Sequence, residues 1–146
     1  MQSGKTTDAP RRQGATVVGG GRPYADNPGP GPYIMAADTL QGDKVVNGDG
    51  ESLGEIEHIM LDVPAGRIAY AVLSFGGVLG MGGKLFAIPW NALILDADGK
   101  CFVLDVSKET LKSAPGFDKD RWPSMADQRW GADLHKHYGV DPYWEI

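Results

Sequence analysis

Short runs rich in apolar and β-branched residues begin at about residue 38, and turn residues separate one run from the next. Runs of this length predict β-strands at the close spacing of a small all-β barrel or sandwich. The apolar positions of the run at 52–62 change parity, which predicts a β-bulge near Glu57 or His58. Six strands are expected, at 44–46, 52–62, 68–75, 84–89, 92–96 and 100–106.

The strand expected at 68–75 is apolar on both faces, since apolar side chains occupy both parities from Ile68 to Phe75. One face of a strand in a small barrel normally meets water, so the second face needs a cover. The C-terminal segment and another subunit are the two candidates for that cover.

Two helices are predicted after the strands. Ser107 is a suitable N-cap for a short helix, and a second helix is expected to begin near Asp127. Trp130, Leu134 and Tyr138 recur at i, i+4 and i+8, so they form one stripe of that helix. We expect this stripe to cover the second apolar face, within its own subunit or across a dimer.

The first 35 residues contain seven glycines and five prolines, and this composition resists both helix and strand. Such a segment buries too little apolar surface to offset its ordering entropy, and we expect it to be disordered. The predicted organisation is therefore a disordered tail at 1–35, a barrel domain at 36–115 and an extension with one helix at 116–146.

Composition limits the partners and the compartment. The chain has 14 basic and 19 acidic residues, a net charge of −5, which argues against nucleic acid as a partner. Cys101 is the sole cysteine, so an intramolecular disulfide is impossible and a reducing compartment fits best. No apolar run suits a secretory signal or a membrane helix. We expect a cytoplasmic protein without direct membrane insertion.

A glycine-rich segment lies between two expected strands, with five glycines in residues 76–83. It lacks the spacing of a Walker loop and of the G-x-G-x-x-G fingerprint, and no helix follows to receive a phosphate. It is interpreted as a hairpin connection, or as a contact surface that presents Val78, Leu79 and Met81.

No catalytic or metal-binding pattern emerges from the remaining residues. His135 and His137 stand two apart and point to different faces of a helix, while Asp133 with His137 supplies only two ligands. The histidines are therefore expected to be solvated or paired with Asp. Cys101 lies in an apolar run, where a thiol acts as a small hydrophobe. We expect no enzyme activity, no cofactor and no metal.

Three segments in order carry a family resemblance: G-E-S-L-G-E-I at 50–56, G-R-I-A-Y-A-V-L-S-F-G-G at 66–77 and Pro89-Trp90. Together they resemble the PRC-barrel family, which includes the cytoplasmic part of the photosynthetic reaction centre H subunit and the C-terminal half of the ribosome-maturation factor RimM. The resemblance covers about Ala36 to Pro115. It implies a six-stranded barrel and an adaptor that binds other proteins, with no shared catalytic residue.

The chain departs from both relatives, since it shows no N-terminal membrane helix and no second barrel. The leading hypothesis is a non-catalytic adaptor that binds a protein partner or forms a homodimer. An assembly factor for a photosynthetic membrane complex or for ribosomes is one alternative, and a small ligand-binding protein or enzyme with a cleft between barrel and helix is another. The interface candidates are Tyr70, Val78, Leu79, Met81, Trp90, Trp130, Leu134 and Tyr138.

Overall fold

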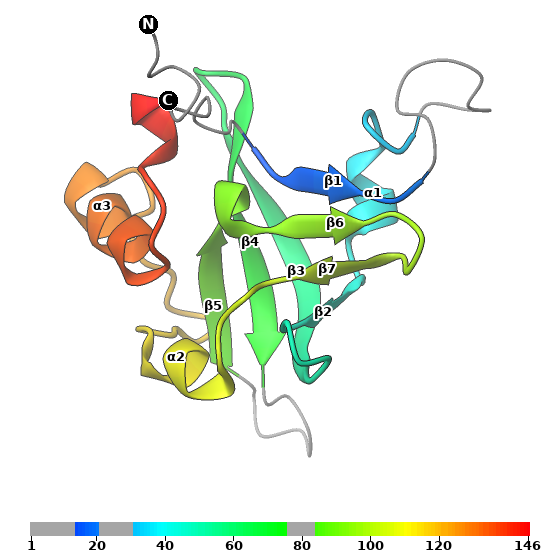
Figure 1. Cartoon of the computed structure of the whole chain (residues 1–146). Coiled ribbons are helices and arrows are strands. Elements are labelled where there is room, and N and C mark those ends of the chain that lie inside the picture. The colour runs from blue at the N-terminus through cyan, green and yellow to red at the C-terminus, as the bar shows by residue number, and fades with distance from the viewer. Residues whose placement is uncertain (1–13, 21–30, 76–83) are drawn as a thin grey trace, which may run out of the picture.

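The computed structural model describes residues 14–20, 31–75 and 84–146, and it is mainly β (Figure 1). Seven strands form one sheet in the order β1-β6-β7-β2-β3-β4-β5. The strands are β1 (Thr16–Val18), β2 (Lys44–Val46), β3 (Ser52–Asp62), β4 (Arg67–Phe75), β5 (Lys84–Pro89), β6 (Ile94–Asp96) and β7 (Cys101–Val103). The helical segments are α1 (Ala37–Leu40), α2 (Lys108–Ser113) and α3 (Gln128–His137), with 3-10 turns η3 (Trp90–Ala92) and η4 (Tyr143–Glu145).

All six expected strands are present, and the first four agree with the sequence pattern to within one residue. The expected bulge is confirmed, because the register of β3 on β4 shifts between Ile56 and His58. The strand expected at 92–96 begins later, at Ile94, since η3 occupies Trp90–Ala92. The strand expected at 100–106 is reduced to Cys101–Val103.

The expectation of a wholly disordered tail is wrong for residues 16–18. They form β1, which runs parallel to β6 with Thr16 opposite Ile94 and Val18 opposite Asp96. The Thr16 N–H donates to the Leu93 carbonyl at 3.1 Å, and the Ala97 N–H donates to the Val18 carbonyl at 2.9 Å. The edge of β6 supplies these hydrogen bonds, and composition alone cannot reveal such an edge. Residues 1–13 and 21–30 lie outside the described part of the chain.

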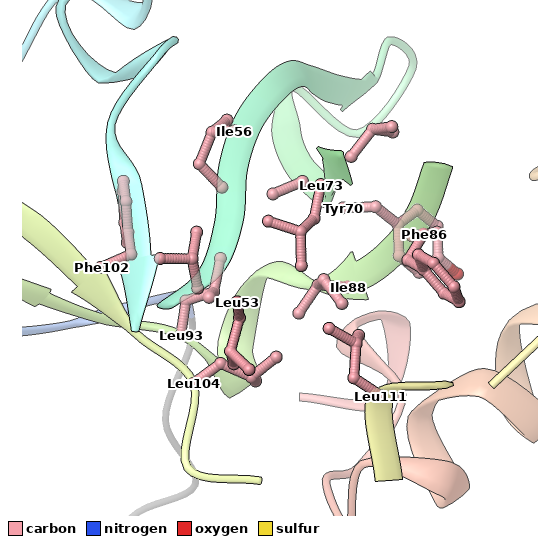
Figure 2. Close-up of a cluster of buried hydrophobic side chains, with 14 of the residues drawn as sticks. Leu53, Ile56, Tyr70, Leu73, Phe86, Ile88, Leu93, Phe102, Leu104 and Leu111 are labelled. Atoms are coloured by element: carbon pink, nitrogen blue, oxygen red, sulfur yellow. The ribbon is translucent and has the colours of Figure 1, made fainter. Parts of the chain in front are cut away.

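The core is a cluster of large apolar side chains enclosed by the curved sheet (Figure 2). Leu111 belongs to α2, is fully buried and faces this cluster from outside the sheet. Ser107 caps α2 as expected, since its hydroxyl oxygen accepts from the Thr110 N–H at 3.0 Å. The apolar core cluster also contains Leu53, Ile56, Leu73, Ile88, Leu93, Phe102 and Leu104.

The chain after α2 returns to the edge of β5 before it enters α3. The N–H of Leu85 donates to the Phe117 carbonyl at 2.9 Å, and the N–H of Phe117 donates back at 2.8 Å. Helix α3 then begins where it was expected, after Asp127, whose carboxylate caps it by accepting from the Arg129 N–H at 2.9 Å. These contacts lead the C-terminal extension onto the sheet.

Candidate interaction surface

The second apolar face of β4 is covered by the C-terminal extension of the same chain. Tyr70 lies on this face and is 1% exposed. Its ring meets Trp130 edge-on at 5.4 Å between centroids and Tyr143 at 5.9 Å. Leu134 and Tyr138 of the same helical stripe are also buried. Of the two covers expected from the sequence, the structure shows the one within the subunit.

A glycine permits this close packing of α3 on the sheet. A methyl group at Gly131 would stand 2.6 Å from the Tyr70 hydroxyl oxygen and 2.9 Å from the ring of Trp144. Both distances are shorter than carbon contacts in proteins allow. Gly131 therefore sets how near the helix backbone comes to Tyr70, and the Tyr70 hydroxyl itself is buried without a hydrogen-bond partner among the described residues.

His135 is neither solvated nor paired with Asp, which corrects the expectation from sequence. It is fully buried, and its Nδ1 lies 2.7 Å from the carbonyl oxygen of Gly131. Its Nε2 accepts from the Tyr143 N–H at 3.3 Å, so the proton belongs on Nδ1 and the ring is neutral. Burial lowers the pKa of His135. The histidine thus ties η4 to α3 as an uncharged structural group.

Trp90 is half-buried and also packs inside the chain. Its ring meets Phe102 edge-on at 5.6 Å between centroids. Gly14 covers another part of the ring, since a methyl group there would be 3.5 Å from Cδ1 and Nε1 of the indole. The segment that leads into β1 therefore lies against Trp90.

The eight interface candidates divide into three groups. Tyr70, Leu134 and Tyr138 are buried within the chain, so a partner cannot reach them in this fold. Trp90 and Trp130 are half-buried and pack against the core. Val78, Leu79 and Met81 lie outside the described residues. The accessible apolar surface of the described residues therefore lies elsewhere.

Two of the three most exposed large apolar side chains among the described residues lie at the β3–β4 turn. Leu61 is 63% exposed and Val63 is 80% exposed. Pro64 and Ala65 are exposed beside them. We call residues 61–65 the hairpin tip. Figure 1 shows the β3–β4 turn near the C-terminal end of the chain. The apolar run Val63-Pro64-Ala65 in this turn is visible in the sequence.

The hairpin tip is held in a defined shape by its own polar residue. The Asp62 carboxylate accepts from the Ala65 N–H at 3.1 Å and from the Tyr143 hydroxyl at 2.5 Å. These hydrogen bonds, with the nearby Arg67 charge, lower the pKa of Asp62. The guanidinium of Arg67 also lies 5.2 Å from the centre of the Tyr143 ring. The tip is therefore anchored to η4.

Burial, with the Asp62 hydrogen bond as the next cause, raises the pKa of Tyr143 to about 12. The phenol therefore stays protonated and keeps donating to Asp62 throughout the ordinary pH range. The link between the hairpin tip and the C-terminal extension does not switch near neutrality.

Other exposed apolar residues are scattered or belong to different surfaces. Trp122 is 39% exposed but meets the rings of Phe117 and His58 at 5.0 Å and 5.4 Å. Tyr33, Ile34 and Met35 precede α1 as a second run of exposed apolar side chains, with 47%, 72% and 38% of their surface exposed. The hairpin tip differs from this run because hydrogen bonds accepted by Asp62 fix its turn and join it to η4.

The described residues contain no cluster of three or more His, Cys, Asp or Glu side chains arranged to hold a metal ion. Cys101 is half-buried, and burial together with Asp96 and Asp43 raises the pKa of its thiol. A protonated thiol is a poor nucleophile. In the same described ranges, no helix is long and apolar enough to cross a bilayer.

Comparison with known proteins identifies the class of fold. The family model of the PRC-barrel domain matches residues 34–111, which is more than half of the chain. The protein therefore belongs to the PRC-barrel domain family, as the sequence resemblance implied, and PRC-barrel domains act in protein interaction and assembly. A search of curated proteins found no match.

Proposed function

We propose that this chain is a non-catalytic cytoplasmic PRC-barrel adaptor that binds a protein partner, or a second copy of itself, through the hairpin tip. The observation that carries the proposal is the exposure of four neighbouring apolar residues, Leu61, Val63, Pro64 and Ala65, at a turn fixed by Asp62 and Tyr143. A rigid apolar group loses little conformational entropy when it is buried, so such a group is a good anchor for an interface.

The expected energy follows from the exposed fractions. Burying a Leu or Val side chain completely is worth about 1.5 to 3 kcal/mol. Leu61 and Val63 still expose roughly two-thirds of their surface or more, so their joint burial would contribute about 2 to 4 kcal/mol. This corresponds to roughly a 30-fold to 1,000-fold change in affinity.

The test compares the wild type with Leu61→Ser/Val63→Ser by light scattering coupled to gel filtration and by sedimentation, up to high micromolar concentration. Ile34→Ser is the matched control, because Ile34 is as exposed as the tip residues but lies beside α1. The proposal predicts that the wild type and Ile34→Ser form a dimer, or retain a specific partner from cells of the source organism, and that the double variant does not.

A clean monomer at high micromolar concentration, together with no partner that depends on the hairpin tip, would overturn the proposal. Equal loss of association in the double variant and in Ile34→Ser would place the interface elsewhere. Circular dichroism on all three proteins verifies that the comparison is made between folded chains.

A further inference from the structure

Strand β1 is attached to the sheet in the way that an extended peptide binds to a protein. It is three residues long and pairs only with β6, at the end of the sheet order. The ladder is extended at both ends by hydrogen bonds from the Thr16 N–H to Leu93 and from the Ala97 N–H to Val18. Residues 21–30 separate this segment from Gly31, where the described chain resumes.

The side chains on β1 face opposite ways. Ala15 and Val17 are partly buried and pack against the core. Val18 is 45% exposed. At the start of the segment, Gly14 lies against the indole of Trp90. The edge of β6 therefore accepts an apolar β-branched side chain at position 17 and small residues at positions 14 and 15.

Asp98 recognises the far end of the segment. Its carboxylate accepts from the Gly20 N–H at 3.0 Å. A methyl group at Gly19 would stand 2.6 Å from the same carboxylate, and Gly19 has a φ of +77°. Side chains are thus disfavoured at position 19 by contact and by backbone conformation. Together these features define a pattern of small-small-x-apolar-x-Gly-Gly.

We propose that the β6 edge, with Trp90 and Asp98 at its two ends, is a binding site for an extended segment of a partner protein that carries this pattern and runs parallel to β6. Residues 14–20 occupy the site in the isolated chain and compete with that partner. The proposal concerns a surface different from the hairpin tip and does not depend on it. Addition of a strand to a sheet edge is a known mode of peptide recognition.

Competition from the chain's own residues 14–20 determines how tightly an added peptide binds to the β6 edge. A segment tethered by a short connection has an effective concentration on the order of millimolar at its own site. A peptide supplied from outside therefore binds the wild type weakly, and its affinity rises when the tethered copy is disabled. Val17→Asp in the full chain disables that copy, since it places a charge against the apolar core.

The experiment adds a synthetic peptide with the sequence of residues 12–20 to the full chain and follows the Ala97 amide and the Trp90 indole by NMR. We expect the peptide to bind Val17→Asp at least ten-fold more tightly than wild type. Val18→Asp is the matched control and should behave as wild type, because residue 18 points to solvent. The same peptide with Asp at the position of Val17 should bind neither chain.

Gly19→Ala provides a second route if Val17→Asp does not fold, since it perturbs the Asp98 contact outside the core and should also increase peptide affinity. Equal affinity for wild type and the disabled variants would overturn the proposal, as would no binding to a folded Val17→Asp chain. A wild-type dimer that exchanges β1 between copies would also overturn it, because a second copy would then be the occupant.

Discussion

Replacing Gly131 by alanine should destabilise the protein, although alanine is the better helix former. Gly131 is buried within α3, where the backbone approaches Tyr70 and Trp144. Helix propensity alone predicts that Gly131→Ala stabilises by about 1 kcal/mol. Steric crowding predicts that Gly131→Ala lowers the free energy of unfolding. The sign of the measured change therefore decides whether α3 is docked on the sheet or is a free appendage.

The distances give the size of the crowding. The new methyl group would stand 2.6 Å from the Tyr70 hydroxyl oxygen and 2.9 Å to 3.0 Å from two carbons of Trp144. Tyr70 is 1% exposed, so its ring has little freedom to move away. Overpacking of this kind costs about 1 to 3 kcal/mol. Because Tyr70 cannot move away, the cost should fall in the upper half of that range, about 2 to 3 kcal/mol, and subtraction of the propensity gain leaves a net loss of about 1 to 2 kcal/mol.

The assay is urea denaturation of wild type, Gly131→Ala, Tyr70→Phe and the double variant. Tyr70→Phe removes a buried hydroxyl that has no hydrogen-bond partner among the described residues, so this change should not lower the free energy of unfolding. The double variant should recover about 1 kcal/mol of the loss caused by Gly131→Ala. Stabilisation by Gly131→Ala, or additivity of the two changes, would refute the docking of α3 against Tyr70.

Three further predictions concern the same extension and the sheet. Trp130→Ala should lower the free energy of unfolding by about 2 to 3 kcal/mol, which is below the range for a fully buried Trp because Trp130 is half-buried. Calorimetry should show a clear fall in melting temperature. The control Arg129→Ala, at a side chain that is 93% exposed, should change the melting temperature little. The pKa of His135 is lowered in the folded state, so the unfolded chain takes up a proton that the folded chain excludes. The free energy of unfolding should therefore be constant above about pH 6.5 and fall below that pH. Normal titration of the His135 ring in NMR spectra would contradict this prediction. Gly54→Ala should prevent folding or cost several kcal/mol, since its methyl group would overlap the Ser74 carbonyl oxygen, and an unchanged denaturation midpoint would show that the register of β3 on β4 is different.

The strands and caps could be predicted because they depend on local sequence. Short apolar-rich runs bounded by turn residues were sufficient for β3 and β5, and the change of parity in β3 located the bulge. Ser107 was recognisable as a cap because its side-chain oxygen can accept from an unpaired N–H of the first helical turn. The contact between α3 and β4 could also be predicted, because the apolar stripe of the helix and the second apolar face of the strand each needed a cover.

The remaining features depend on contacts between distant segments. Strand β1 lies in a glycine-rich and proline-rich region, and its pairing exists because β6 has a free edge there. His135 can be buried because the backbone groups of Gly131 and Tyr143 provide hydrogen-bond partners for its two ring nitrogens, and its own sequence position does not reveal this. Several aromatic interface candidates proved to be covered by their own chain, which local sequence cannot distinguish from covering by a partner. The hairpin tip was overlooked because apolar residues in a turn carry no periodic signal.

The C-terminal extension covers the second face of the sheet, and we propose that the hairpin tip is the surface left for a partner. Photo-crosslinking in cells of the source organism tests this most directly, with a photoreactive residue placed at Val63 in one variant and at Ile34 in the other. We expect a discrete crosslinked product, with another protein or with a second copy, from position 63 and not from position 34. No product from position 63, or the same product from both positions, would contradict it.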